Sequence, residues 1–422
     1  MLSHDPTDAL AALDSRKTGI DSEALSREAV EAYQLKKLQD TLNWCFERSP
    51  FYREQLLGYP RNMRSLEEWQ AYPLTTAGDV RKRPFSFVCV SQSDVERVVT
   101  LETSGTSGPP KRLYFTAEDQ ELTRDYFHHG MSTFTTAGDR VLILLHCARL
   151  GSVGDLLDQA LTRLRAEGIR HGLVTDVAET LRVLRQEEAT VVVGVPVQVL
   201  SLVRSAAAQQ MTRPRLESVL LTVDHVPEAV AQAVESTWCC TVFNHYGMTE
   251  MGLGGGVECE ARQRYHLREA DLFFEIIDPL TGEMVPDGQF GEIVFTTLTR
   301  RAMPLIRYRT GDVSRFLSGT CACGTVLRHL EKVRYRWNGR VPLAPDLFLT
   351  IADLDDALFE LECVLDFAAS VSNGVLKVTV QAEFTEVGTA VVKALSVLPA
   401  IKAIGLDLKV EVQKAFVNPS GK

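Results

Sequence analysis

Residues 103–111 carry side chains of the types and spacing that could bind a polyphosphate. They are Thr103, Ser104, Gly105, Thr106, Ser107, Gly108, Pro109, Pro110 and Lys111. Glycines let a backbone turn tightly and direct its N–H groups at one point, the hydroxyls add donors, and Lys111 adds a positive charge. The spacing is not that of the P-loop G-x-x-x-x-G-K-[ST], because prolines precede the lysine and no Ser or Thr follows it. A flexible linker is the alternative, but residues 98–101 and 113–115 read as flanking strands, which favours a phosphate-binding loop.

Two later motifs accompany this loop. Residues 244–250 read Asn-His-Tyr-Gly-Met-Thr-Glu, and residues 307–312 read Arg-Tyr-Arg-Thr-Gly-Asp. In this order the three motifs resemble those of the adenylate-forming superfamily of acyl-CoA synthetases. Four shorter stretches are similar to its phenylacetate-CoA ligase branch, namely Ser49-Pro50-Phe51-Tyr52, Pro84-Phe85, Thr296-Thr297-Leu298-Thr299 and Cys321-Ala322-Cys323-Gly324. The resemblance covers about Leu35 to Arg340 and continues more weakly to Lys422.

The resemblance implies a role for each motif in activating a carboxylate with ATP. The β- and γ-phosphates would be held by Ser104, Gly105, Thr106, Ser107, Gly108 and Lys111. Thr249 would donate to the α-phosphate, and Glu250 would supply a carboxylate to Mg²⁺. Tyr246, followed by Gly247, would stack on adenine, and Asp312 would accept hydrogen bonds from the ribose hydroxyls. Tyr246, Glu250 and Asp312 each have an ordinary alternative, as a core tyrosine, a helix-start carboxylate and a turn residue.

Two basic residues are less clearly assigned. Arg309 either meets a phosphate or carboxylate of the substrates or forms a structural ion pair. Lys422 ends a stretch similar to the family's Pro-x-Ser-x-Gly-Lys, whose lysine enters the active site during adenylation. The alternative for Lys422 is a solvated C-terminal tail.

Thiols and an imidazole form a second constellation. Cys259, His266, Cys321 and Cys323 make a Cys₃His set of the kind that holds structural rather than catalytic zinc. Their spacing is not a zinc-finger signature, His329 competes as a ligand, and free thiols are the alternative. Some members of the resembled branch carry a similar cluster, so we expect a structural Zn²⁺ site here.

Composition excludes several classes of protein. The 422 residues are 45% apolar, which suffices for two or three domains with sizeable cores. A formal charge of −10 and the lack of a basic run argue against nucleic-acid binding, and no apolar stretch approaches the ~20 residues that span a bilayer. The N-terminus lacks the pattern of a signal peptide, and nine cysteines without framework spacing suit a reducing compartment. We therefore expect a cytoplasmic protein without nucleic-acid or membrane partners, and a homodimer is a candidate assembly.

Hydrophobic patterning predicts an α/β fold. A helix is expected over residues 26–48, and buried strands over 141–145, 190–193 and 218–223 alternate with helices, as in a parallel sheet flanked by helices. Residues 272–277 and 291–296 read as antiparallel strands of a small β subdomain. We expect a large N-terminal domain over residues 1–340 and a small, mobile α+β lid domain over residues 341–422, with strands near 376–382 and 406–412 around a helix near 391–398.

Three stretches depart from the resembled family. Residues 339–343, Gly-Arg-Val-Pro-Leu, lack both aspartates of the family's hinge, and Pro342 should stiffen it. Residues 222–225, Thr-Val-Asp-His, replace the usual turn on the adenine side. Residues 145–151, Leu-His-Cys-Ala-Arg-Leu-Gly, replace the aromatic acyl-pocket segment of phenylacetate ligases. The identity of the acid is therefore open.

The resemblance implies an AMP-forming acid–thiol ligase. With ATP and Mg²⁺ the enzyme would convert a small carboxylic acid to an acyl-adenylate and pyrophosphate, and then pass the acyl group to coenzyme A. One alternative is adenylation alone or transfer to another acceptor. A second is a nucleotide-binding regulatory protein that has lost turnover, which the altered hinge favours and the intact Lys111, Glu250 and Asp312 oppose.

Overall fold

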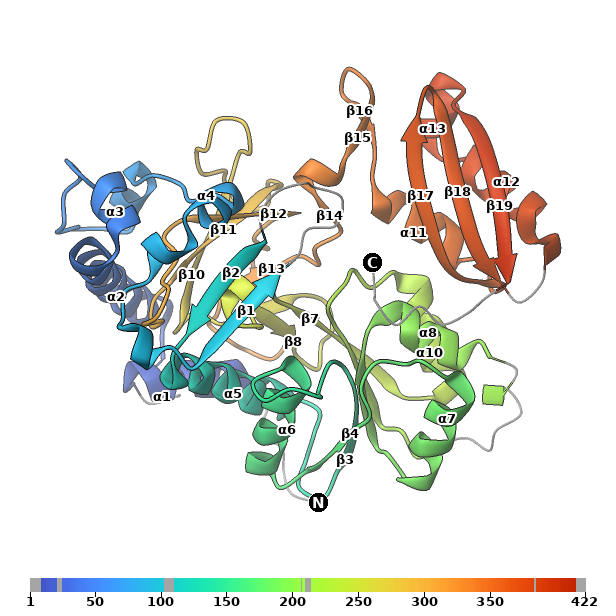
Figure 1. The fold of residues 1–422 in the computed structure, drawn as a ribbon, viewed down its shortest axis with the longest axis horizontal. Coiled ribbons are helices and arrows are strands. Elements are labelled where there is room, and N and C mark those ends of the chain that lie inside the picture. The colour runs from blue at the N-terminus through green and yellow to red at the C-terminus, as the bar shows by residue number, and fades with distance from the viewer. Residues whose placement is uncertain are drawn as a thin grey trace. The chain divides into compact units, whose positions relative to one another are not determined.

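The computed structural model describes residues 9–20, 25–101, 110–205, 207–208, 214–382 and 385–414. These residues form two compact units, each with its own hydrophobic core (Figure 1). The first unit comprises Met1–Phe134, Gln159–Leu164 and His245–Val333, and the second comprises Thr135–Asp158, Arg165–Asn244 and Arg334–Lys422. The sequence-based boundary at residue 340 stays a prediction.

The second unit is built on parallel strands. Its elements before residue 245 are β3 (Arg140–Leu144), α6 (Val153–Leu164, which continues into the first unit), β4 (Glu167–Arg170), α7 (Val177–Gln186), β5 (Val191–Gly194), α8 (Pro196–Val203), β6 (Ser218–Leu221), α10 (Glu228–Trp238) and β7 (Thr241–Tyr246). The strands lie in the order β4-β3-β5-β6-β7, and every neighbouring pair is parallel. All residues of β5 and β6 are buried, as their apolar composition predicts for a sheet covered on both faces.

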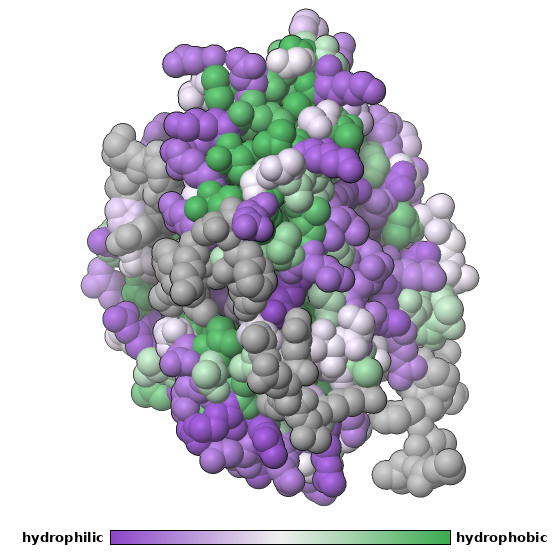
Figure 2. All heavy atoms as spheres, turned by 90° about the vertical axis from the view of Figure 1, so that its right-hand side faces the viewer, coloured by the Kyte–Doolittle hydropathy of each residue, from purple (hydrophilic) through white to green (hydrophobic). Residues whose placement is uncertain are grey.

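The C-terminal segment of the second unit contains the three-stranded sheet β17-β18-β19 and the two-stranded sheet β15-β16, and it contributes β14 to the sheet of β10 (Leu272–Ile277), β11 (Gly291–Thr297) and β12 (Tyr308–Ser314). Its elements are β14 (Tyr335–Arg336), β15 (Val341–Ala344), β16 (Leu347–Leu349), α11 (Ile351–Phe359), β17 (Val364–Ser372), β18 (Val375–Ala382), α12 (Gly388–Ser396), α13 (Pro399–Ile404) and β19 (Asp407–Lys414). Strand β18 pairs antiparallel with β17 and parallel with β19, and its residues alternate between half-buried and buried. On the side that Figure 2 shows, hydrophobic side chains lie in patches between hydrophilic ones, which is ordinary for a surface in contact with water.

Antiparallel strands and N-terminal helices make up the first unit. They are α1 (Ala9–Thr18), α2 (Arg27–Arg48), α3 (Pro50–Gln55), α4 (Ala77–Lys82), β1 (Arg97–Leu101), β2 (Lys111–Phe115), α5 (Ala117–Met131), the 3₁₀ turn η5 (Thr249–Met251), β8 (Gly256–Glu258), β9 (Tyr265–Leu267), β10 (Leu272–Ile277), β11 (Gly291–Thr297), β12 (Tyr308–Ser314) and β13 (His329–Leu330). Helix α2 has the predicted bounds because Ser26 caps its N-terminus and Ser49 both ends it and caps α3, where Pro50 takes the first helical position.

The expected α/β fold is confirmed, including the antiparallel pairing of β10 with β11. None of the helices in the described residues is long and apolar enough to span a membrane.

Candidate active site

Lys111 lies at the base of the predicted phosphate loop. Strands β1 and β2 form an antiparallel hairpin in which Leu101 pairs with Lys111. The flanking strands predicted from the sequence are therefore confirmed. The loop residues Ser104, Gly105, Thr106, Ser107 and Gly108 themselves fall outside the described part of the chain, and their proposed role stays a prediction.

Glu250 is placed opposite Lys111 by a tight turn after β7. The chain leaves Tyr246, passes through η5 and returns to pair Tyr246 with Gly256 of β8. At Gly247 an added Cβ would lie 2.6 Å from the carbonyl oxygen of Leu253, so only glycine fits the turn. Thr249 begins η5 and is half-buried, and the carboxylate of the buried Glu250 points back toward β2.

Lys111, Glu250 and Tyr308 form one hydrogen-bonded group. Lys111 Nζ donates to Glu250 Oε1 and, at 3.2 Å, to the hydroxyl of Tyr308. The Tyr308 hydroxyl donates to the same Glu250 oxygen at 3.1 Å. A cation and a carboxylate, both largely buried, thus lie beside the loop in a defined arrangement. A set of one carboxylate with hydroxyl neighbours suits Mg²⁺, which proteins usually hold through one or two carboxylates and the substrate's phosphates.

A bulge in β12 places Asp312 against Tyr246. The pairing of β11 with β12 shifts register between Glu292 and Val294, and Gly311 takes a φ of +80° there. The hydroxyl of Tyr246 donates to Asp312 Oδ2 at 2.9 Å, and both residues are buried. The structure therefore brings together the ring predicted for adenine and the carboxylate predicted for ribose. Their roles toward a nucleotide stay predictions.

Two further predicted site residues are Arg309 and Lys422. Arg309 donates to Glu292 and, at 2.8 Å, to the carbonyl of Pro279, so it makes the ion pair that the sequence analysis gave as the alternative. Its role in cofactor binding stays a prediction. Lys422 lies outside the described residues.

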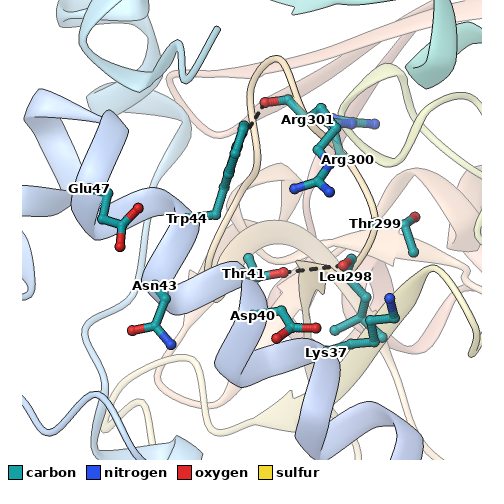
Figure 3. Close-up of a pocket in the computed structure, with 10 residues that line it drawn as sticks. All are labelled: Lys37, Asp40, Thr41, Asn43, Trp44, Glu47, Leu298, Thr299, Arg300 and Arg301. Atoms are coloured by element: carbon teal, nitrogen blue, oxygen red, sulfur yellow. Dashed lines mark hydrogen bonds between the residues drawn. The ribbon is translucent and has the colours of Figure 1, made fainter.

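Sequence reasoning missed two residues next to Glu250. It quoted Tyr308 within a motif but gave it no role, although its hydroxyl bridges Lys111 and Glu250. It gave no role to Arg300, whose Nη1 donates to the backbone carbonyl of Glu250 at 2.6 Å. Arg300 also lines a cavity of about 400 Å³ between helix α2 and residues 298–301 (Figure 3). A signal was available, because Arg300 directly follows the Thr296–Thr299 stretch.

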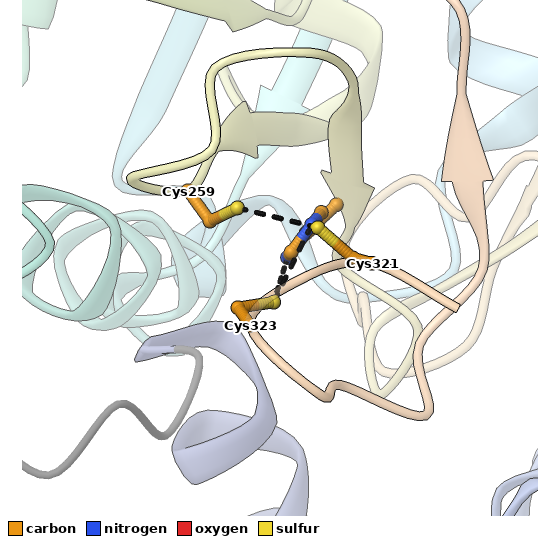
Figure 4. A group of neighbouring side chains, drawn as sticks. Cys259, Cys321 and Cys323 are labelled. Carbon is orange, nitrogen blue, oxygen red and sulfur yellow. Dashed lines mark hydrogen bonds between the residues drawn. The ribbon is translucent and has the colours of Figure 1, made fainter.

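The predicted zinc ligands meet at one point of the first unit. Single ligand atoms of Cys259, His266, Cys321 and Cys323 all lie within 4.8 Å of one another, and Figure 4 shows the three thiols pointing inward. The Sγ atoms of Cys259 and Cys321 are 3.6 Å apart, and Cys323 Sγ is 3.9 Å from His266 Nε2. Zinc–sulfur bonds of about 2.3 Å in a tetrahedron place sulfurs about 3.8 Å apart, so the four residues fit zinc.

The surroundings of Cys259 favour the form that binds metal. Hydrogen bonds with Cys323 and His266 lower the pKa of the Cys259 thiol to about 3, although its partial burial opposes this shift. The thiolate is the ligand form of cysteine. His329, the competing candidate, pairs with His266 across β13 and β9, and its ring stacks edge-on against that of His266 at 4.9 Å.

Comparison with known proteins gives the family. The model of AMP-binding enzymes matches residues 83–298. The phenylacetate-coenzyme A ligase of Thermus thermophilus is 31% identical over 322 residues, which cover 72% of this chain and 69% of that protein. The phenylacetate-coenzyme A ligase of Escherichia coli is 27% identical over 329 residues, which cover 74% and 72%.

Solved structures share the fold. A 2-hydroxyisobutyryl-CoA ligase in the postadenylation state, in complex with R3-HIB-AMP, has a TM-score of 0.76 at 21% identity and covers 94% of this chain and 86% of its own. An anthranilate CoA ligase in complex with anthranoyl-AMP has a TM-score of 0.59 at 14% identity, covering 80% and 67%. Because the family model matches half of the chain and the match to the Thermus relative spans more than two thirds of both chains, the chain belongs to the AMP-binding enzyme family, in its phenylacetate-CoA ligase-like branch.

Proposed function

We propose that this chain is an AMP-forming carboxylic acid–CoA ligase. In the first half-reaction a carboxylate oxygen attacks the α-phosphorus of ATP, the bond to pyrophosphate breaks, and an acyl-adenylate forms. In the second the coenzyme A thiol loses its proton, its sulfur attacks the acyl carbon, and AMP leaves. The observation that carries this proposal is the convergence of Lys111, Glu250 and Tyr308 at the base of the loop in a chain of this family.

Charge on both sides of the α-phosphorus must be neutralised during the first half-reaction. Lys111 would hold the β- and γ-phosphates together with the loop, and Thr249 would donate to the α-phosphate. Glu250 would hold Mg²⁺, which would draw charge from the phosphate oxygens. Tyr308 would hold the Lys111 and Glu250 side chains in fixed relative positions, because its hydroxyl contacts both.

The remaining residues would hold the nucleotide and complete the site. Tyr246 and Asp312 would bind adenine and ribose, and their mutual hydrogen bond would fix the carboxylate before the nucleotide arrives. Lys422 would contribute a second cation during adenylation, on the strength of its sequence motif alone.

A structural zinc ion and a cytoplasmic location belong to the same proposal. Cys259, His266, Cys321 and Cys323 would hold zinc where the loop after β8 meets the Cys321–Gly324 turn. All nine cysteines lack disulfides, which supports a reducing compartment. The homodimer stays a prediction.

The deciding test is pyrophosphate–ATP exchange with a panel of aliphatic, aromatic and hydroxy acids, followed by mass spectrometry of products formed with coenzyme A. We expect exchange that depends on one class of acid and on Mg²⁺, and an acyl-CoA product from the same acid. Exchange without a thioester would overturn coenzyme A as the acceptor in favour of adenylation alone. ATP binding without exchange across the panel would favour a regulatory protein, which the altered hinge at Pro342 also favours.

A further inference from the structure

Arg300 is a buried cation directly behind the predicted metal ligand. The residue is 7% exposed, and its guanidinium lies 5.0 Å from the ring centre of Phe115. Nη1 donates to the backbone carbonyl of Glu250 at 2.6 Å. Phe115 lies on β2, the strand that begins with Lys111. One side chain therefore contacts both the strand of Lys111 and the main chain of Glu250.

The charge of Arg300 is maintained without an ion pair among the described residues. No carboxylate lies within salt-bridge distance in that part of the chain, and Asp119 acts only as a nearby charge. Burial lowers the pKa of Arg300 to about 10, although Asp119 opposes this shift, so the guanidinium remains protonated at neutral pH. A buried cation is costly unless its surroundings compensate. Here a carbonyl and an aromatic face do so.

The loop that carries Arg300 is anchored on both sides. The Thr299 hydroxyl donates to Asp271 at 2.6 Å. The backbone N–H groups of Arg301 and Ala302 donate to the carboxylate of Asp119 at 2.7 and 2.9 Å. Asp119 in turn completes the capping box at the start of α5. The position of Arg300 is thus fixed independently of Glu250, as a support must be.

The segment that carries Glu250 needs such a support. It is a single 3₁₀ turn of three residues, followed by Gly252 and Leu253 with φ of +75° and +68°. Backbone hydrogen bonds close the turn at Met251, Gly252 and Leu253. In the described residues none of them ends on the Glu250 carbonyl, to which Arg300 donates. A rotation of the Glu250 peptide would carry the carboxylate away from Lys111 and Tyr308.

We propose that Arg300 is a positioning residue for adenylation, which holds the Glu250 peptide so that the carboxylate faces Lys111 and the bound metal. This inference rests on the proposed function of the site. Arg300 itself would touch no reacting atom and would act through Glu250.

The cavity beside α2 makes the proposal testable by chemical rescue. Arg300 lines it together with Thr41, Trp44 and Thr299 (Figure 3). Its volume of about 400 Å³ exceeds that of a guanidinium ion, so truncation of Arg300 leaves a space that this ion can reach from solvent.

The experiment compares Arg300→Ala and Arg300→Lys with the control Arg301→Ala in the full-length protein. Arg301 is adjacent, but its side chain lies over the ring of Trp44 and not on Glu250. We expect Arg300→Ala to lower the kcat of pyrophosphate exchange by roughly 10–100-fold while the KM for ATP changes less than about tenfold. Arg300→Lys should retain part of the rate, and Arg301→Ala should stay near the parent. Millimolar guanidinium chloride, with sodium chloride as the ionic control, should restore activity of Arg300→Ala in a saturable way.

Hydrogen exchange supplies a readout that does not depend on turnover. Amides of residues 247–255 should exchange faster in Arg300→Ala and regain protection with guanidinium. A parent protein that shows no pyrophosphate exchange would overturn the proposed function, yet the amide result would still decide the role of Arg300. Unchanged amide protection, or a lower melting temperature without any rescue, would overturn the positioning role.

Discussion

Glu250 accepts hydrogen bonds from two side chains that are far from it in sequence, Lys111 and Tyr308. The carboxylate is buried, so removal of one partner leaves a charge that water solvates poorly. In the proposed mechanism this buried carboxylate would attract the metal ion, and the neighbouring Lys111 would turn to the phosphates.

This arrangement predicts the effect of Glu250→Gln. The variant keeps the shape and the main-chain bond to Arg300 but loses the negative charge needed to hold Mg²⁺. We expect ATP binding within about tenfold of the parent and pyrophosphate exchange lower by roughly 10²-fold or more. Isothermal titration with ATP and the exchange assay measure the two quantities. Glu331→Gln, which removes a partly exposed carboxylate paired with Arg315, is the control. Exchange at the parent rate would remove Glu250 from the site.

The sequence identified Lys111, Glu250 and Asp312 because they stand in recognisable motifs. It could not show that Lys111 contacts Glu250, since 139 positions separate the two residues and only the fold brings β2 to η5. The sequence could not reveal the proposed role of Arg300 in the same way. Arg300 contacts the backbone carbonyl of Glu250, and every residue type has such a carbonyl.

At the scale of elements, hydrophobic periodicity predicted the strands and helices well where apolar runs are continuous, as in β5 and β6. The bulge in β12 could not be predicted in this way. It depends on the pairing register with β11 and on the φ of +80° at Gly311, neither of which alters the apolar pattern. Yet this bulge sets the direction in which Asp312 points.

The proposed zinc site is likewise a property of elements, because its four side chains come from the end of β8, strand β9 and the Cys321–Gly324 turn. We expect about one zinc per chain in the purified protein by elemental analysis. Cys321→Ser should lower both the zinc content and the melting temperature, since metal binding stabilises the folded ligand set. Cys363→Ser is the matched control, because Cys363 lies outside the cluster. Metal-free protein with the parent's stability would show that these cysteines are free thiols.

At the scale of the whole chain, the sequence missed how the N-terminal helices are held. The sequence analysis places its first helix at residues 26–48, yet α1 precedes it, and Leu10 and Leu13 of α1 are fully buried. Lys17 pairs with Asp271, and Arg27 pairs with Glu269 at 2.6 Å. These partners lie more than 240 positions later in the chain, where a local reading of the sequence cannot find them.

Asp14 of α1 is a buried carboxyl group that faces other carboxylates where α1 packs on residues 269–271. Its Oδ1 accepts from the N–H of Ala270 at 3.1 Å, and its Oδ2 has no hydrogen-bond partner among the described residues. Burial and the nearby Glu269 raise the pKa of Asp14 well above its ordinary value, against the smaller opposing effects of the Ala270 bond and Lys17. Asp271 also faces it and adds to this rise.

The sign of the resulting pH effect follows from proton linkage. Because the folded state binds the Asp14 proton more tightly than the unfolded state, its contribution is complete below the unfolded pKa of about 3.9. That contribution is lost as the pH rises toward and through the folded pKa. Asp271 behaves in the opposite sense, since Arg268 and Lys17 lower its pKa despite its burial, so its contribution is lost as the pH falls.

Asp14→Asn separates the two effects. The amide keeps the acceptor for Ala270 and cannot ionise, so the variant should match the parent near pH ~3 and melt about 1–2 °C higher at pH ~8. Thermal unfolding at constant ionic strength across this range measures the difference. Asp14→Ala is the control, because it leaves the Ala270 N–H without its acceptor and should melt lower at every pH. A difference between Asp14→Asn and the parent that stays constant with pH would mean that Asp14 is ionised alike in both states, and that α1 is held without a proton on this carboxyl group.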